Sequence, residues 1–197
     1  WDKYPVMQVA SAEGYVHDPE LVINFYNERR KQLLDVEPNA GHTGLAELEK
    51  DFNVTVVTQN VDNLHERAGS THVIHLHGEL TKVCSSRDPY NPRYVRELKP
   101  EEYEVKMGDK AGDGSQLRPF IVWFGEAVPE IETAIGYVEK ADIFVIIGTS
   151  MNVYPAAGLL NYVPRTTEVY LIDPKPVDTH SMRQIHVIQK GASEGVK

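Results

Sequence analysis

The stretch PEIETAIGYVEKADIFVIIGTS, residues 129–150, joins an amphipathic helix to a strongly apolar strand. Ile131, Ala134, Ile135 and Val138 recur at i, i+3, i+4 and i+7, which predicts a helix with one apolar face. The run IFVII that follows has no polar alternation, so we expect a strand buried on both faces, as in a parallel sheet. This unit predicts an α/β fold.

Helices and strands alternate on both sides of this unit. Those predicted cover, in chain order, residues 18–35, 39–52, 53–58, 71–78, 118–125, 155–163, 168–173 and 184–189. Such alternation is typical of a Rossmann-like, mostly parallel sheet with helices on both faces. Residues 84–117 interrupt the pattern, because they are rich in charge, glycine and proline, and we interpret them as a small inserted module.

Composition limits the classes of partner. The net charge of −9 argues against nucleic acid, because phosphate binding needs a basic face. The single cysteine, Cys84, excludes an internal disulfide and a cysteine zinc cluster. No apolar run approaches the ~20 residues of a membrane helix, and no secretory signal is visible. We therefore expect a cytoplasmic protein without nucleic acid or membrane partners, of undetermined oligomeric state.

Polar side chains cluster where predicted strands end. They are Gln59, Asn60 and Asp62 after VTVV, and Gly148, Thr149 and Ser150 after IFVII. Parallel strands bind ligands at their carboxyl ends, and a glycine there lets the backbone approach a nucleotide closely. For the GTS segment alone, a structural turn remains the alternative. A GxGxxG loop is absent, since the nearest match, Gly112-Asp113-Gly114, lies in the insert without a preceding strand.

Three histidines lie in the predicted strand at residues 71–78. His75 and His77 would face one way and His72 the other. A metal would need a third ligand from elsewhere, so a metallohydrolase using His75 and His77 is a weak alternative to structural hydrogen bonding. His77 differs from the others because it adjoins Gly78 at the strand end, where a general base could reach a ligand.

The helix at 18–35 carries Tyr26 and Arg29 three residues apart, on one face. With Arg30 they could form a solvated edge, the interpretation that spacing alone favours. Alternatively, Arg29 could reach into a cleft and bind a carboxylate with its fork of donors.

Together these motifs resemble the sirtuins, NAD-dependent protein-lysine deacylases. The motifs that carry the resemblance are TQNVDNLHERAG (58–69), HLHGEL (75–80), RPFIVWFGE (118–126) and GTSMNVYPAAG (148–158). The similarity runs from Asp18 to Gly195. FYNERR (25–30) resembles a bacterial branch whose Tyr-x-x-Arg pair recognises succinyl and malonyl groups.

The resemblance implies two domains. A Rossmann-like NAD-binding domain would take residues 39–80 and 118–197. A small domain would take residues 1–38, its helical part, and 81–117, the counterpart of a zinc module. Sirtuins close that module with four cysteines, whereas this chain has only Cys84, so we expect no zinc and a module that is held by packing and hydrogen bonds or is held loosely.

The resemblance also implies roles for individual residues. Gln59, Asn60, Val61 and Asp62 would line nicotinamide and its ribose, with Asn60 and Asp62 taking part in catalysis beside the base His77. The residues implied for ADP-ribose are Gly148, Thr149, Ser150, Asp173 and Ala192. Those implied for the acyl-lysine substrate are Tyr26 and Arg29, and for clamping its peptide as an added strand Val122, Phe124, Gly125, Glu126 and Val153.

The implied reaction transfers the acyl group of a protein or peptide lysine to ADP-ribose and releases nicotinamide. His77 would accept a proton from a ribose hydroxyl, a role suited to a neutral imidazole. The first strand, glycine-rich phosphate loop and cofactor loop of sirtuins would lie before Trp1, so we expect a fragment of a longer protein. The alternative is a non-catalytic module that binds ADP-ribose or an acylated peptide.

Overall fold

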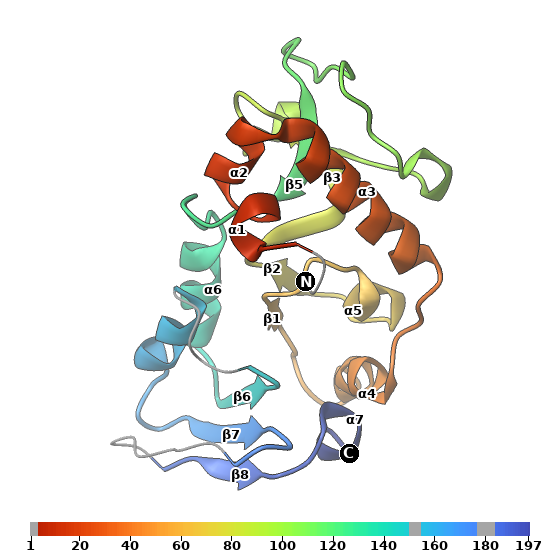
Figure 1. The fold of residues 1–197 in the computed structure, drawn as a ribbon. Coiled ribbons are helices and arrows are strands. Elements are labelled where there is room, and N and C mark those ends of the chain that lie inside the picture. The colour runs from red at the N-terminus through yellow and green to blue at the C-terminus, as the bar shows by residue number, and fades with distance from the viewer. Residues whose placement is uncertain (1–3, 150–154, 177–183) are drawn as a thin grey trace. The chain divides into compact units, whose positions relative to one another are not determined.

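The computed structural model describes residues 4–149, 155–176 and 184–197 (Figure 1). Contacts between Cα atoms divide the chain into two compact units. The first unit consists of Trp1–Glu37, Gln59–Asn63 and His75–Pro129. The second unit consists of Pro38–Thr58, Leu64–Ile74 and Glu130–Lys197.

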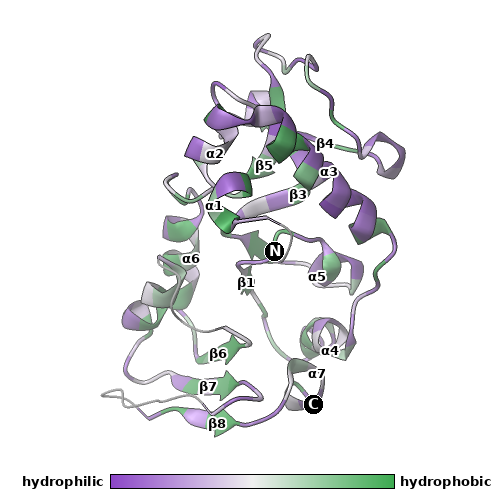
Figure 2. Cartoon of the chain, viewed as in Figure 1, coloured by the Kyte–Doolittle hydropathy of each residue, from purple (hydrophilic) through white to green (hydrophobic). Residues whose placement is uncertain are grey.

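The second unit contains a three-stranded parallel sheet. Its strands β6 (Ile143–Ile147), β7 (Glu168–Ile172) and β8 (His186–Ile188) lie side by side in that order (Figure 1). Figure 2 shows that β6 and β7 are mostly hydrophobic, and Val169 of β7 is fully buried. The amphipathic helix α6 (Ile131–Val138) precedes β6, as predicted. The parallel strands confirm the predicted α/β class.

The prediction that residues 143–147 form a strand buried on both faces is wrong. Ile143 and Val145 share one face of β6 and are 46% and 43% exposed. Only the other face, with Ile146, is covered within the described part of the chain. The apolar run correctly indicated a parallel strand, but the burial of each face depends on which elements pack against it.

Short elements complete the second unit. They are α4 (Ala40–Leu48), β1 (Val56–Thr58), α5 (Leu64–Arg67), β2 (Val73–His75), η3 (Ala156–Tyr162) and α7 (Ala192–Gly195). The boundary between the units runs through β2, because its last residue, His75, is counted in the first unit. Asn39 caps α4, because its side-chain oxygen accepts from the N–H groups of Gly41 and His42. The helix predicted at 155–163 is a 3₁₀-helix, η3.

The first unit packs three helices with an antiparallel sheet. The helices are α1 (Val6–Val9), α2 (Ala12–His17) and α3 (Pro19–Leu34), and the strands, in spatial order, are β4 (Arg96–Glu97), β3 (Gly78–Ser85) and β5 (Leu117–Ile121). Short 3₁₀-helices η1 (Pro92–Tyr94) and η2 (Pro100–Glu102) lie in the insert. Asp18 caps α3 by accepting from the N–H of Leu21, and Pro19 occupies its first turn, as this part of the sequence predicted.

Helix α3 holds the insert through buried polar side chains. Asn27 donates to the carbonyl of Val105 over 2.7 Å and accepts from its N–H over 2.9 Å. Arg30 donates to the carbonyl of Tyr103 over 2.7 Å, and burial lowers the pKa of Arg30 to about 10. Around them lies an apolar cluster of Ile23, Val83, Leu98, Val105, Ala111 and Leu117. The insert is therefore held by packing and hydrogen bonds.

The favoured interpretation of Tyr26, Arg29 and Arg30 as a solvated edge is wrong. Tyr26 is 4% exposed and Arg30 is 3% exposed, and Arg29 is half-buried. Their face of α3 points into the first unit.

No helix within the described ranges is long and apolar enough to cross a membrane.

Candidate functional site

Three segments of the first unit meet at His77. The imidazole of His77 hydrogen-bonds to the backbone of Gln59, and its own carbonyl accepts from the N–H of Val122 over 2.9 Å. Next to it, the N–H of Leu80 donates to the carbonyl of Val61 over 2.7 Å. Backbone and side chain of His77 are thus tied to segments that the sequence predicted to meet at one site.

His77 lies in a turn between β2 and β3, and not at the end of one strand covering residues 71–78. Gly78 has a φ of +84°, which favours glycine, and a Cβ there would collide with the carbonyl oxygen of Phe120. The turn and the close approach of β5 both need this glycine. His77 is half-buried, and burial lowers the pKa of its imidazole despite the bond to Gln59. A neutral imidazole of this kind can accept a proton.

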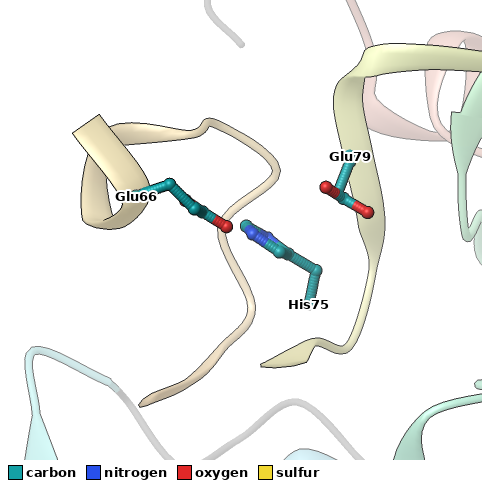
Figure 3. Close-up of side chains that lie close together, drawn as sticks. All are labelled: Glu66, His75 and Glu79. Atoms are coloured by element: carbon teal, nitrogen blue, oxygen red, sulfur yellow. The ribbon is translucent and has the colours of Figure 1, made fainter. Parts of the chain in front are cut away.

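The other two histidines have structural partners. Nδ1 of His75 lies 3.1 Å from the carbonyl oxygen of Asn60, so this nitrogen must carry the proton and donate. Nδ1 of His72 lies 2.9 Å from Oγ1 of Thr55 in the second unit. His75 and His77 do not share one strand face, because the turn intervenes. Figure 3 shows His75 beside Glu79 of β3, which belongs to the same unit.

Helix α3 brings two hydrogen-bond donors together one turn apart. The hydroxyl oxygen of Tyr26 accepts from the indole N–H of Trp123 over 3.0 Å. Burial raises the pKa of Tyr26 to about 12, so the phenol keeps its proton. Cζ of Arg29 lies 4.9 Å from the ring centroid of Phe25. Among the described residues, the buried Nε of Arg29 has no hydrogen-bond partner, so both side chains can donate to an anion.

The carboxylate of Glu126 is hydrogen-bonded to several donors within the first unit. Its carboxylate accepts from Arg118 over 2.7 and 3.0 Å, from the hydroxyl of Tyr90 over 2.9 Å and from the N–H of Trp123 over 2.9 Å. Burial favours a raised pKa for Glu126, but these donors outweigh it and the pKa is lowered. The carboxylate therefore holds the loop after β5.

Arg118 and Trp123 were not singled out from the sequence, although one signal was present. Arg118 lies in the apolar run RPFIVWFG, which was predicted to be a strand. A charge inside a core strand needs a partner, so Arg118 implied a buried anion nearby. The guanidinium carbon of Arg118 also lies 3.7 Å from the ring centroid of Trp123.

The backbone N–H and carbonyl of Phe124 are both hydrogen-bonded within the first unit. Phe124 donates its N–H to the carbonyl of Ala10 over 2.9 Å and accepts from the N–H of Ala12 over 3.4 Å. Its side chain is 51% exposed, and Gly125 beside it is exposed with a φ of +90°. A peptide strand would therefore have to pair mainly through Gly125. Val153, predicted for the opposite side of the peptide, lies outside the described residues.

The parallel sheet of the second unit brings other predicted residues to one edge. Gly148 and Thr149 follow β6, Asp173 follows β7, and Ala192 begins α7 after β8. The N–H of Gly148 donates to the carbonyl of Ile172, the last residue of β7, over 3.0 Å. The N–H of Asp173 donates to the carbonyl of Ile188, the last residue of β8, over 3.3 Å. A Cβ at the exposed Gly148 would meet no described atom within 4 Å, and Asp173 supplies a carboxylate, so this edge can hold a nucleotide. Ser150 lies outside the described residues.

The insert does not fit a zinc ion. Cys84 is fully buried, its Sγ faces the carbonyl oxygen of Pro119 at 3.7 Å, and burial raises its pKa to about 12. Zinc requires a thiolate, which such a pKa disfavours. The neighbouring polar groups are bound to one another: Ser85 Oγ donates to Asp113 over 2.7 Å, as does Ser115 Oγ.

Comparisons with known proteins agree with this arrangement. A sequence model described as the Sir2 family matches residues 1–155. An NAD-dependent protein deacylase of Bacteroides thetaiotaomicron is 83% identical over 197 residues, which cover 100% of this chain and 84% of that protein. An NAD-dependent protein deacylase of Helicobacter pylori is 48% identical over 192 residues, covering 98% of this chain and 81% of that protein.

Solved structures are also similar. A crystal structure of a Sir2 homologue–NAD complex has a TM-score of 0.86 and 34% identity, and the match covers 100% of this chain and 76% of that one. A complex named Sir2–p53 peptide–NAD+ has a TM-score of 0.77 and 29% identity, with 94% of this chain and 78% of that one covered.

Proposed function

The chain belongs to the Sir2 family. From its Tyr26–Arg29 pair we propose that it removes acyl groups ending in a carboxylate, such as succinyl and malonyl, from lysine side chains. The predicted resemblance to sirtuins and the predicted Rossmann-like α/β class are confirmed. The activity is that of an NAD-dependent protein deacylase, which acts on acylated proteins or peptides. The acyl preference and the residue roles are our proposals.

The acyl preference rests on the pair Tyr26 and Arg29. Arg29 has a buried Nε without a hydrogen-bond partner among the described residues, one helical turn from the hydroxyl of Tyr26. Leaving a buried donor unpaired costs about 1–3 kcal/mol, more for a charged group, so the pair favours an anionic ligand. A carboxylate at the end of an acyl chain would satisfy both donors, whereas an acetyl group ends in a methyl group that cannot accept a hydrogen bond.

His77 is the proposed general base. Its lowered pKa keeps the imidazole neutral near pH 7, and its bond to the backbone of Gln59 fixes the ring beside the Gln59–Asp62 segment. NAD, when bound, releases nicotinamide and supplies the ribose that receives the acyl group. His77 would accept the proton that a ribose hydroxyl gives up in that transfer.

The segment that follows β1 is proposed to hold nicotinamide and its ribose. Gln59, Asn60, Val61 and Asp62 would line this part of the site. Their backbone is fixed by bonds to His77, to His75 and to Leu80, which gives the amide and carboxylate groups a rigid base. Asn60 and Asp62 would also act in catalysis by orienting the ribose for proton removal.

The edge of the parallel sheet is proposed to bind the ADP-ribose part. The residues assigned to it are Gly148, Thr149, Ser150, Asp173 and Ala192. Asp173 already accepts from the N–H of Lys175 over 2.8 Å through Oδ1, which leaves its second oxygen as the acceptor for a ribose hydroxyl. The substrate peptide is assigned to Val122, Phe124, Gly125 and Val153, with Glu126 fixing the loop from behind.

An acyl panel tests the proposal. Peptides identical except for acetyl-, succinyl- or malonyl-lysine are incubated with the protein and NAD, and nicotinamide release gives kcat/KM for each. We expect the two acidic acyl groups to exceed acetyl by at least about tenfold, or about 1.4 kcal/mol. A preference for acetyl-lysine would contradict the proposal while leaving the deacylase activity intact.

A further inference from the structure

Trp123 makes a contact that bears on which acyl groups Tyr26 can bind. We infer that Trp123 is a positioning residue for acyl specificity: its indole N–H occupies an acceptor site of the Tyr26 hydroxyl, so that Tyr26 presents its proton to the substrate. This inference rests on the proposed function and extends it to a residue that touches neither NAD nor the acyl group.

The direction of the Trp123–Tyr26 hydrogen bond is fixed by chemistry. An indole nitrogen can only donate, so at 3.0 Å the oxygen of Tyr26 must accept. Trp123 is 2% exposed and Tyr26 is 4% exposed, so water does not compete freely for this contact. Burial raises the pKa of Tyr26 to about 12, so the hydroxyl keeps its proton while its oxygen accepts from Trp123. Tyr26 is therefore set to donate, which suits a carboxylate oxygen.

Arg118 and Glu126 hold Trp123 in this orientation. The guanidinium carbon of Arg118 lies 3.7 Å from the centroid of the Trp123 ring, and Arg118 also donates to the carbonyl of Ile121 over 2.7 Å. Glu126 accepts from the backbone N–H of Trp123 over 2.9 Å and from Arg118. A cation over an indole face is attracted by the ring, so Arg118 holds the plane of Trp123 in place.

The arrangement distinguishes classes of acyl group. A succinyl or malonyl group ends in oxygens that accept from Tyr26 and Arg29. A neutral amide of the same shape presents N–H groups as well, and these would face donors. An acetyl group does not extend to this point, so the Trp123–Tyr26 bond should not affect its turnover.

The test is a double-mutant cycle on Trp123→Phe and Tyr26→Phe, with kcat/KM measured on succinyl- and acetyl-lysine peptides. Phe keeps an apolar ring at position 123 but lacks the N–H. We expect Trp123→Phe to reduce the succinyl-to-acetyl ratio about tenfold, mainly by raising KM for the succinyl peptide. In the Tyr26→Phe background the same substitution should leave the ratio unchanged, because its target hydroxyl is gone.

Two outcomes would overturn the inference. One is an unchanged ratio in folded Trp123→Phe, and the other is an equal loss with and without the Tyr26 hydroxyl. If Trp123→Phe does not fold, a benzothienylalanine at position 123 replaces the N–H by sulfur in nearly the same shape and must give the expected loss. Wild-type preference for acetyl would contradict both the inference and the proposed function, whereas a succinyl preference that survives Trp123→Phe contradicts the inference alone.

Discussion

The imidazole of His77 hydrogen-bonds to the backbone of Gln59, which joins the proposed base to the proposed nicotinamide segment. The carbonyl of His77 also accepts from Val122, at the start of the proposed peptide-binding loop. One residue thus contacts two of the segments assigned to different parts of the reaction. A displacement of His77 should therefore affect nicotinamide release and acyl transfer together.

Replacing His77 by Asn removes the base but keeps a side chain that can bond to the Gln59 backbone. We expect kcat for deacylation to fall by roughly 10²–10⁴-fold, the usual contribution of a general base. The matched control is His17→Asn on the exposed surface of α2, which should keep full activity. Turnover of acyl peptide by His77→Asn at the wild-type rate would show that another group takes the proton.

The pH profile reports the state of His77. Burial lowers its pKa from the ordinary 6.5, so the neutral form increases as pH rises and predominates at neutral pH. We expect the acidic limb of kcat/KM to have its midpoint below 6.5 and the limb to vanish from the residual activity of His77→Asn. A midpoint above 7 that belongs to His77 would contradict the burial argument.

Arg29→Met should separate acidic from neutral acyl groups. Loss of the cation that pairs with a desolvated carboxylate costs roughly 2–5 kcal/mol, so desuccinylation should fall far more than deacetylation. The rate constants for both peptides are compared with those of Lys31→Met, an exposed cation on the same helix. Equal losses for the two acyl groups would remove Arg29 as the selector.

The Arg118–Glu126 pair should stabilise the first unit strongly. Its side chains are 4% and 14% exposed, and removing one partner of a buried pair costs roughly 3–5 kcal/mol. Glu126→Ala should lower the free energy of unfolding, measured with urea, by that amount. Glu104→Ala breaks an exposed pair with Lys106 at 3.9 Å and should change stability by less than about 1 kcal/mol. Similar values for the two variants would contradict this difference.

The insert should not need a metal. Because Cys84 is not a thiolate and Asp113 is bound to Ser85 and Ser115, a zinc chelator should leave the Tm unchanged. Asp113→Asn should lower the Tm, whereas Asp109→Asn, which removes the carboxylate bonded to the Lys106 N–H, gives the comparison for an exposed turn. Stoichiometric zinc in the purified protein, with a Tm that falls on chelation, would contradict this view of the insert.

The same network predicts an acid dependence. Hydrogen bonds from the Ser85 and Ser115 hydroxyls lower the pKa of Asp113 to about 2. A carboxyl with a depressed folded-state pKa contributes stability above its unfolded pKa of about 3.9 and loses it as pH falls toward 2. The Tm difference between wild type and Asp113→Asn should therefore shrink below about pH 4. A constant difference would mean that the network does not depend on the ionised carboxylate.

Local patterns in the sequence were sufficient for the longer elements. The cap of α3 at Asp18 and the apolar face of α6 depend on neighbours within a few residues, and both were predicted. The short helices α1 and α2 were not, because four and six residues give too little periodicity. The turn at His77 depends on the approach of Phe120 to Gly78, a long-range contact that composition does not reveal.

The site was predictable where strand ends supplied the signal. Gln59 and His77 were grouped on that basis and do contact each other. The bond between Tyr26 and Trp123 joins distant parts of the chain, and their spacing in sequence carries no sign of it. The domain boundaries and the roles of Ser150 and Val153 remain predictions.

The most direct test follows all products at once. The protein is incubated with NAD and a succinyl-lysine peptide, and nicotinamide, succinyl-ADP-ribose and free lysine peptide are measured by mass spectrometry. Equal amounts of the three products are expected, and in His77→Asn the three should fall together by roughly 10²–10⁴-fold. Free succinate formed without NAD, or bound NAD and peptide with no release of nicotinamide, would contradict this expectation.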